Sequence, residues 1–254
     1  MVQAIIFDLD GTLVQTEKLK AQAYAIAVQK IRNLAQPDAR AIDAYKEALG
    51  SGRDVASRHV MDKLNLEKEL RPLMPQYRAS EPAAVLTEIR TGIYHQMIAD
   101  PGVIARHRWT YTLELLRIAR ENRCRIALAT MSHLNDTLFI LRALDIDRAF
   151  DVVVTAEDVV HTKPDPEIYQ VAARKLDVPP GDCLVIEDSP NGVQSATAAG
   201  MKVIAFATPF TFEGLHSKRI SQILKDVMIA HHPEEIIELA HNYLINNPPN
   251  QETN

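Results

Sequence analysis

The order of strand and helix patterns constrains the fold of this chain more than any other feature. Residues 2–7 form a short apolar run with the β-branched content of a buried strand. Residues 15–99 carry helical patterns and no strand signal, and from residue 110 onward helices and strands alternate. Strands that alternate with helices pair in parallel within one sheet. We therefore expect an α/β fold, a Rossmann-like parallel sheet core with an inserted all-α helical cap domain.

The individual elements follow from hydrophobic periodicity and from capping residues. After the first strand we expect strands at residues 125–129, 151–154, 183–186, 202–206 and 227–230, and helices at 112–121, 134–144, 166–176, 190–199 and 233–244. Within the inserted block we expect helices at 21–34, 39–49, 54–64 and 82–98, followed by a turn at 100–102. The predicted catalytic core therefore comprises residues 1–14 and 107–246, the cap comprises 15–106, and the polar, proline-containing residues 247–254 form a disordered tail.

Composition excludes several classes of protein. A chain of 254 residues with 46% hydrophobic content can bury one large or two modest cores. Its net charge of -5 gives no general attraction to nucleic acid or to an anionic membrane, so neither is an expected partner. Asp8 and Asp10 lie where a signal peptide would need an apolar core, so we expect a cytoplasmic protein, as a monomer or weak homodimer. Cys124 and Cys183 lie in strands predicted to be buried, which favours reduced core thiols.

Two carboxylates follow the first strand directly. Asp8 and Asp10 are two residues apart, so both can face one pocket as the strand ends, and Gly11 allows the backbone to bend there. Close carboxylates repel each other unless a cation lies between them or one keeps its proton. Both arrangements suit phosphoryl transfer, in which one carboxylate attacks phosphorus, Mg²⁺ neutralises charge and the other carboxylate protonates the leaving oxygen. Taken alone, the pattern also fits a helix N-cap or a surface turn.

Three further polar segments follow later strands. Thr130 ends the strand at 125–129, Lys163 begins a Lys-Pro-Asp-Pro run, and Glu187 and Asp188 follow the strand at 183–186. Each segment has an ordinary structural interpretation, because Thr130, Glu187 and Asp188 could cap helices and Lys163 could be a solvated loop residue. The carboxyl ends of parallel strands share one edge of the sheet, however, so these side chains can converge on a single crevice.

With Asp8-Leu9-Asp10-Gly11-Thr12 as the first motif, these four segments resemble the haloacid dehalogenase superfamily, in its phosphatase and β-phosphoglucomutase-like branch with a helical cap. The resemblance implies that Asp8 is the nucleophile and Asp10 the general acid and base, while Thr130 and Lys163 stabilise the transferring group. It also implies a Mg²⁺ cofactor. The implied metal ligands are Asp8, the backbone carbonyl of Asp10, Asp188, and Glu187 either directly or through water.

Candidate substrate-binding residues come from both predicted domains. Arg53 follows a glycine-rich bend in the cap, where relatives often place an arginine that meets the substrate. Met131, Ser132 and Lys20 are the other candidates, the first through its backbone N–H group. Many relatives have aspartate at the position of Gln15 and histidine at that of Lys20, and in the phosphoglucomutase relatives that histidine is associated with catalysis. This departure weakens the interpretation as a mutase.

The sequence thus favours a Mg²⁺-dependent phosphomonoesterase that acts through a phospho-aspartate on a small phosphorylated metabolite, with sugar phosphates among the candidates. Two alternatives remain open. One is a β-phosphoglucomutase-like phosphotransferase, in which a sugar hydroxyl replaces water as acceptor. The other is a non-catalytic ligand-binding protein on the same fold, since fold alone does not determine function.

Overall fold

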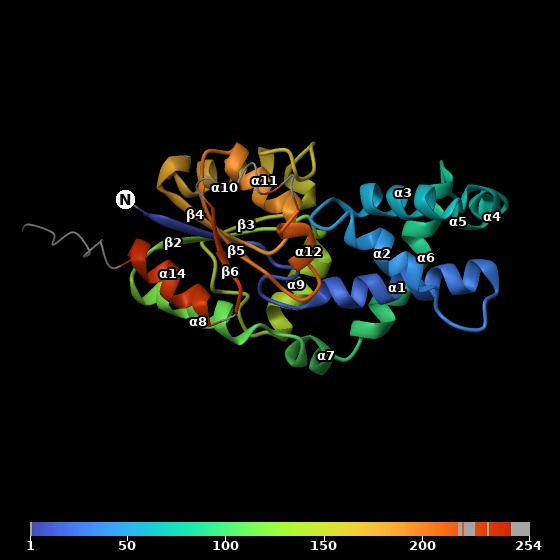
Figure 1. Ribbon diagram of the computed structural model, residues 1–254, viewed down its shortest axis with the longest axis horizontal. Coiled ribbons are helices and arrows are strands. Elements are labelled where there is room, and N and C mark those ends of the chain that lie inside the picture. The colour runs from blue at the N-terminus through green and yellow to red at the C-terminus, as the bar shows by residue number, and fades with distance from the viewer. Residues whose placement is uncertain (1, 218–219, 221–226, 233, 245–254) are drawn as a thin grey trace, which may run out of the picture.

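The computed structural model describes residues 2–217, 220, 227–232 and 234–244, and its centre is a six-stranded sheet (Figure 1). All strands are parallel, in the order β3-β2-β1-β4-β5-β6. Their bounds are β1 Ala4–Phe7, β2 Arg125–Ala129, β3 Val152–Val154, β4 Cys183–Glu187, β5 Lys202–Phe206 and β6 Val227–Ala230. The predicted parallel Rossmann-like sheet is confirmed.

Helices cover both faces of the sheet, because its strands are apolar on both sides. In β1, Ile5 and Phe7 pack into one core cluster, while Ala4 and Ile6 pack into the other. On the first face lie α8 (Thr110–Glu121), α9 (Leu134–Ala143) and α14 (Glu235–Leu244), and on the second lie α10 (Glu167–Leu176) and α11 (Pro190–Ala198). The strand order reverses between β1 and β4, and the carboxyl ends of the strands at such a switch point form the usual ligand crevice of this fold.

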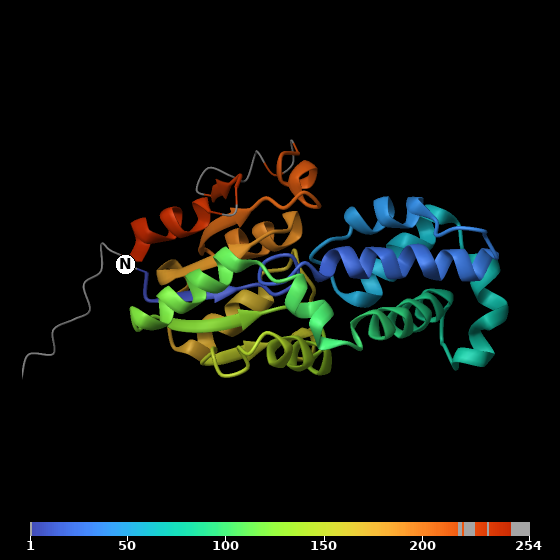
Figure 2. The same cartoon turned by 90° about the horizontal axis from the view of Figure 1, so that it is seen from below.

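A group of helices lies beyond the carboxyl ends of the strands and forms the cap (Figure 2). Its helices are α1 Thr16–Arg32, α2 Ala39–Lys46, α3 Arg53–Leu64, α4 Glu67–Leu70, η1 Arg71–Leu73, α5 Met74–Tyr77 and α6 Pro82–Ile98. Aromatic packing joins its first two helices, since the rings of Tyr24 and Tyr45 lie 5.0 Å apart. The core also contains three short elements, η2 Ala156–Asp158, η3 Pro180–Asp182 and α12 Phe212–Leu215.

Several local predictions are wrong in detail. The turn expected at residues 100–102 is the start of helix α7 (Pro101–Arg106), whose N-cap Asp100 accepts a hydrogen bond from the Gly102 N–H. Pro166, expected as the first helical residue of α10, is instead its N-cap residue. Cys124 lies just before β2 and is only half-buried, whereas Cys183 lies buried in β4 as expected.

Other expectations have mixed outcomes. The predicted caps of α11 are confirmed, because the Ser189 hydroxyl accepts from the Gly192 N–H and Gly200 has a φ of 78°. The tail expected at residues 247–254 falls outside the described residues. The division into core and cap at residues 14/15 and 106/107 stays a prediction. Within the described part of the chain, no helix is both long and apolar enough to cross a membrane.

Candidate active site

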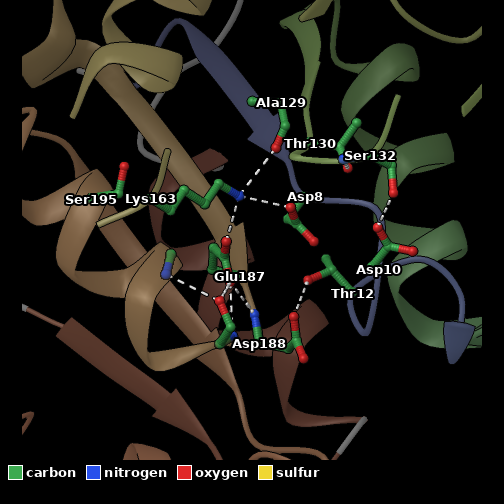
Figure 3. Close-up of polar contacts among 12 residues, drawn as sticks. Asp8, Asp10, Thr12, Ala129, Thr130, Ser132, Lys163, Glu187, Asp188 and Ser195 are labelled. Atoms are coloured by element: carbon green, nitrogen blue, oxygen red, sulfur yellow. Dashed lines mark hydrogen bonds and ion pairs between the residues drawn. The ribbon is translucent and has the colours of Figure 1, made fainter. Parts of the chain in front are cut away.

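Three strand ends bring the predicted motifs together (Figure 3). Asp8 follows β1 and donates its backbone N–H to Ile186 of β4 at 3.0 Å. Thr130 follows β2 and donates its backbone N–H to Val154 of β3 at 3.0 Å. Sheet hydrogen bonding thus continues one residue beyond β1 and β2, so the side chains of Asp8 and Thr130 are fixed at one edge of the sheet.

Lys163 joins these strand ends. Its Nζ atom lies 2.7 Å from Asp8 Oδ1, 2.7 Å from Glu187 Oε1 and 3.3 Å from the Ala129 carbonyl oxygen. The Lys163 side chain is only 1% exposed, which excludes the solvated-loop interpretation. Burial acts to lower the pKa of Lys163, but the charges of Asp8 and Glu187 outweigh it and raise that pKa well above its usual value, so the ammonium stays charged.

Asp8 keeps one carboxylate oxygen available for chemistry. Oδ1 accepts from Lys163, and no hydrogen bond to Oδ2 occurs among the described residues. Burial raises the pKa of Asp8 to about 7, with Lys163 opposing the rise and the charges of Glu187 and Asp10 adding to it. A cation beside Asp8 would lower this pKa and favour the ionised, nucleophilic form.

Both carboxylate oxygens of Glu187 accept hydrogen bonds from residues around the site. Oε1 accepts from Lys163 and from the Tyr169 hydroxyl, the latter at 2.9 Å. Oε2 accepts from the backbone N–H groups of Asp188 and Ser189, both at 2.8 Å, and from the Ser189 hydroxyl. A β carbon at Gly192 would lie 1.6 Å from Oε1, so the backbone of α11 packs directly against this carboxyl. These contacts favour a positioning role for Glu187 over direct metal ligation.

The carboxyl of Asp188 is less fully engaged, and with Asp8 it could hold a metal ion beside Glu187. Oxygen atoms of these three carboxylates lie within 4.8 Å of one another. Asp188 accepts one long hydrogen bond, 3.4 Å, from the Thr12 hydroxyl. Burial and the charges of Glu187, Glu17 and Asp8 raise the pKa of Asp188 well above its usual value. Buried, mutually repelling hard oxygen donors are what a Mg²⁺ ion would stabilise.

Gly11 makes this arrangement of Asp188 possible. A β carbon at Gly11 would lie 2.0 Å from Asp188 Oδ2, and the residue has a φ of 92°. Both the space and the backbone conformation therefore require glycine here. The backbone bend expected at Gly11 is therefore confirmed.

Asp10 is held by side chains from the cap and from the core. Its Oδ1 lies 2.6 Å from Lys20 Nζ and accepts a hydrogen bond from the Thr16 hydroxyl, while Oδ2 accepts from the Ser132 hydroxyl at 2.6 Å. Lys20 also donates to the Ser132 hydroxyl at 2.9 Å. Burial acts to raise the pKa of Asp10, but the charge and hydrogen bond of Lys20, with the hydrogen bonds from Ser132 and Thr16, lower it below its usual value.

The hydroxyl of Thr130 is oriented by its own loop. It accepts a hydrogen bond from the Ser132 N–H at 3.1 Å, which leaves its proton for another acceptor. Thr130 is fully buried at the edge of the sheet, and Met131 and Ser132 line the adjoining pocket. The structure thus places these three predicted residues beside Asp8 and Asp10.

The cap closes over this edge of the sheet and leaves a cavity of about 50 Å³ between the two parts. Close contact depends on the glycine-rich bend before α3, because a β carbon at Gly50 would lie 2.3 Å from the Ser189 hydroxyl oxygen. The Asn191 amide donates to the Leu49 carbonyl oxygen at 2.8 Å and ties the bend to the core. Arg53 lines the cavity, with its guanidinium 2.5 Å from Asp136 of α9.

Sequence reasoning missed two charged residues that line the same cavity, Glu17 of α1 and Arg90 of α6. Glu17 is 1% exposed and Arg90 is 4% exposed. Both carboxylate oxygens of Glu17, and Nε of Arg90, are buried without a hydrogen-bond partner. The available signal was a charged residue on the core-facing side of an otherwise apolar helix, which is clearest for Arg90 between the buried Leu86 and Tyr94.

Burial has a strong effect on Glu17. It raises the pKa of Glu17 to about 8, and the charge of Asp10 adds to the rise. At neutral pH this carboxyl is therefore mostly protonated in the folded protein.

The relatives of this chain include proteins that are named as phosphatases. A phosphorylated carbohydrates phosphatase from Thermotoga maritima is 30% identical over 203 residues, a match that covers 80% of this chain and 84% of the relative. A phosphoglycolate phosphatase from Nitrosospira multiformis is 28% identical over 215 residues, covering 83% of this chain and 85% of the relative.

Solved structures agree on the fold. A β-phosphoglucomutase from Clostridium difficile superposes with a TM-score of 0.73 at 19% identity, and the match covers 97% of this chain and 98% of that chain. At this identity the likeness concerns the fold alone. The model of the haloacid dehalogenase-like hydrolase family matches residues 2–200, a stretch that contains all four motifs. This protein belongs to the haloacid dehalogenase-like hydrolase family.

Proposed function

We propose that this protein is a Mg²⁺-dependent phosphomonoesterase that acts on a small phosphorylated metabolite through a phospho-aspartate. The observation that carries the proposal is the pairing of Asp8 with the buried ammonium of Lys163, which leaves Asp8 Oδ2 without a partner among the described residues. A buried carboxylate with one oxygen fixed and the other available is suited to attack phosphorus.

In the first step, Asp8 Oδ2 attacks phosphorus and the bond to the leaving oxygen breaks. Lys163 and the Thr130 hydroxyl stabilise negative charge on the transferring group. Asp10 gives a proton to the leaving alcohol. In the resting site, Lys20, Thr16 and Ser132 hold Asp10 in its charged form, and the negative charge of a bound phosphoester acts to raise its pKa so that it can carry that proton.

In the second step, water attacks the phosphorus of the phospho-aspartate while Asp10 takes a proton from it. Inorganic phosphate leaves and Asp8 is regenerated. Mg²⁺ held by Asp8 and Asp188, with the Asp10 carbonyl, would neutralise charge on the phosphoryl oxygens. Glu187 would position Lys163 and the start of α11, and so support the metal site indirectly.

Phosphate release from 4-nitrophenyl phosphate tests the proposal. The wild-type protein should release phosphate with Mg²⁺ and stop when EDTA is added, and Asp8→Asn should lose activity by about 10³-fold or more, the scale of removing a nucleophile. An exposed substitution on the cap, Glu88→Gln, is the matched control and should leave activity unchanged. Equal activity of Asp8→Asn and wild type would refute the assigned nucleophile.

The mutase alternative predicts a different product. A β-phosphoglucomutase-like enzyme would convert a sugar 1-phosphate to the 6-phosphate with little free phosphate. Lys20 stands where the resemblance places a catalytic histidine and is engaged with Asp10 and Ser132. This favours hydrolysis, and measuring both products from one sugar 1-phosphate decides between the two.

A further inference from the structure

Of the three cationic side chains that line the cavity, two form ion pairs and the third, Arg90, does not. Lys20 lies 2.6 Å from Asp10, and Arg53 lies 2.5 Å from Asp136. Arg90 is buried, with only 4% of its surface exposed, yet it has no ion pair and no hydrogen bond to any residue that the structure describes. A buried charge without a partner is costly, so folded proteins retain such a group mainly where a ligand completes it.

Aromatic contact compensates Arg90 only in part. Its guanidinium carbon lies 5.2 Å from the centroid of the Tyr24 ring, a cation–π distance. Such a contact covers one face of the guanidinium, and its N–H groups form no hydrogen bond to any residue that the structure describes. Those N–H groups have the planar, forked geometry that binds a carboxylate or phosphate through two hydrogen bonds.

Arg90 and the nucleophile line the same cavity from opposite parts of the molecule. Asp8 follows β1 in the core, whereas Arg90 lies on cap helix α6. Glu17, which also lines the cavity, forms no ion pair with Arg90. The cap side of the cavity therefore holds one uncompensated positive charge.

We propose that Arg90 binds a second oxyanion on the leaving group, so that the preferred substrate is a phosphomonoester that also carries a carboxylate or another phosphate. The inference rests on the proposed phosphatase function. The phosphoryl group would meet Asp8 in the core while the second anionic group would meet Arg90 in the cap.

Matched substrates test this directly. 3-Phosphoglycerate and glycerol 3-phosphate share a three-carbon skeleton and differ by a carboxylate against a hydroxymethyl group. Fructose 1,6-bisphosphate and fructose 6-phosphate form the corresponding pair for a second phosphate. Hydrogen bonds between charged groups contribute about 1.5–3 kcal/mol, so kcat/KM should favour the doubly anionic member of at least one pair by about 10- to 100-fold.

Substitutions of Arg90 test whether this residue causes the preference for the doubly anionic substrate. Arg90→Gln should reduce the preference by about 10-fold or more, mainly through KM of the doubly anionic substrate, and Arg90→Lys should restore part of it. Arg71→Gln, an exposed arginine on the outer part of the cap, is the matched control and should keep the wild-type preference. A merely structural role of Arg90 would affect both members of a pair equally.

Binding separates failure of this inference from failure of the proposed function. Calorimetric titration of 3-phosphoglycerate and glycerol 3-phosphate, and of the two fructose phosphates, into Asp8→Asn protein needs no turnover. If the wild type hydrolyses no phosphoester, the proposed function fails, and Arg90-dependent binding of the doubly anionic member still supports the inference. No preference in either pair, or one that Arg90→Gln leaves unchanged, overturns it.

Discussion

Replacing Glu17 by glutamine should stabilise the protein, and the gain should grow as the pH rises. Glu17 has both carboxylate oxygens buried without hydrogen-bond partners, and its pKa in the folded state is about 8 against 4.5 for an ordinary glutamate. Below about pH 4.5, both the folded and unfolded states hold the proton, so Glu17 contributes no pH dependence.

Between these two pKa values, the unfolded chain releases a proton that the folded chain keeps. Unfolding therefore becomes easier as the pH rises, by about 1.4 kcal/mol for each pH unit. The accumulated cost is about 3 kcal/mol at pH 7 and approaches about 5 kcal/mol above the folded pKa of about 8. Glutamine has a similar shape and no proton to release, so Glu17→Gln avoids this cost.

Urea unfolding of the wild type and of Glu17→Gln, with EDTA present, measures the difference in free energy of unfolding. It should be under about 1 kcal/mol at pH 5 and reach several kcal/mol at pH 8.5. Glu88→Gln is the control, because this exposed glutamate lies on cap helix α6. A difference that stays constant with pH, or that shrinks as the pH rises, would refute the buried, protonated state of Glu17.

Three further substitutions test the packing around the site. Gly11→Ala should lower the free energy of unfolding, measured in urea, by about 1–3 kcal/mol and abolish phosphate release, because the φ of Gly11 is 92° and the new β carbon would lie 2.0 Å from Asp188 Oδ2. A variant with the stability and activity of the wild type would contradict this. Gly50→Ala, whose β carbon would meet the Ser189 hydroxyl at 2.3 Å, should raise KM by keeping the cap from closing, and steady-state kinetics with an unchanged KM would argue against closure. Tyr169→Phe should lower the free energy of unfolding, measured in urea, by about 1–3 kcal/mol, because Glu187 loses a 2.9 Å hydrogen bond. An unchanged free energy of unfolding would mean that the remaining donors to Glu187 suffice.

The core of the fold was predictable because its signals are local. Each strand of the sheet is a short apolar run, and Asp8, Thr130 and Asp188 follow their strands directly. In a parallel sheet, the position of a residue at a carboxyl end determines which edge it reaches. The convergence of these residues therefore followed from element order alone.

Helix boundaries were less predictable where two local signals compete. Asp100-Pro101-Gly102 has the composition of a turn, yet Asp100 is also an N-cap residue and Pro101 suits the first turn of a helix. Burial of Ile104 against the core favours the helix. Only the tertiary packing decides between these outcomes.

The cap side of the site required the structure. Lys20 and Asp10 are ten positions apart in sequence, too far for helical spacing to predict their contact, which depends on how α1 leaves the core. Arg90 and Glu17 are charged residues on cap helices, and periodicity alone does not show that both line a cavity. For Arg53, the sequence suggested a substrate contact, and the structure adds its ion pair with Asp136.

Locating the phosphoryl group during turnover tests the phospho-aspartate mechanism most directly. The wild-type protein is mixed with a phosphomonoester and Mg²⁺, quenched in acid within one turnover, digested and examined by mass spectrometry. The phospho-aspartate mechanism predicts an acid-stable, hydroxylamine-sensitive phosphoryl group on the peptide that contains Asp8, and none in Asp8→Asn. Turnover with the phosphoryl group on another residue would contradict it.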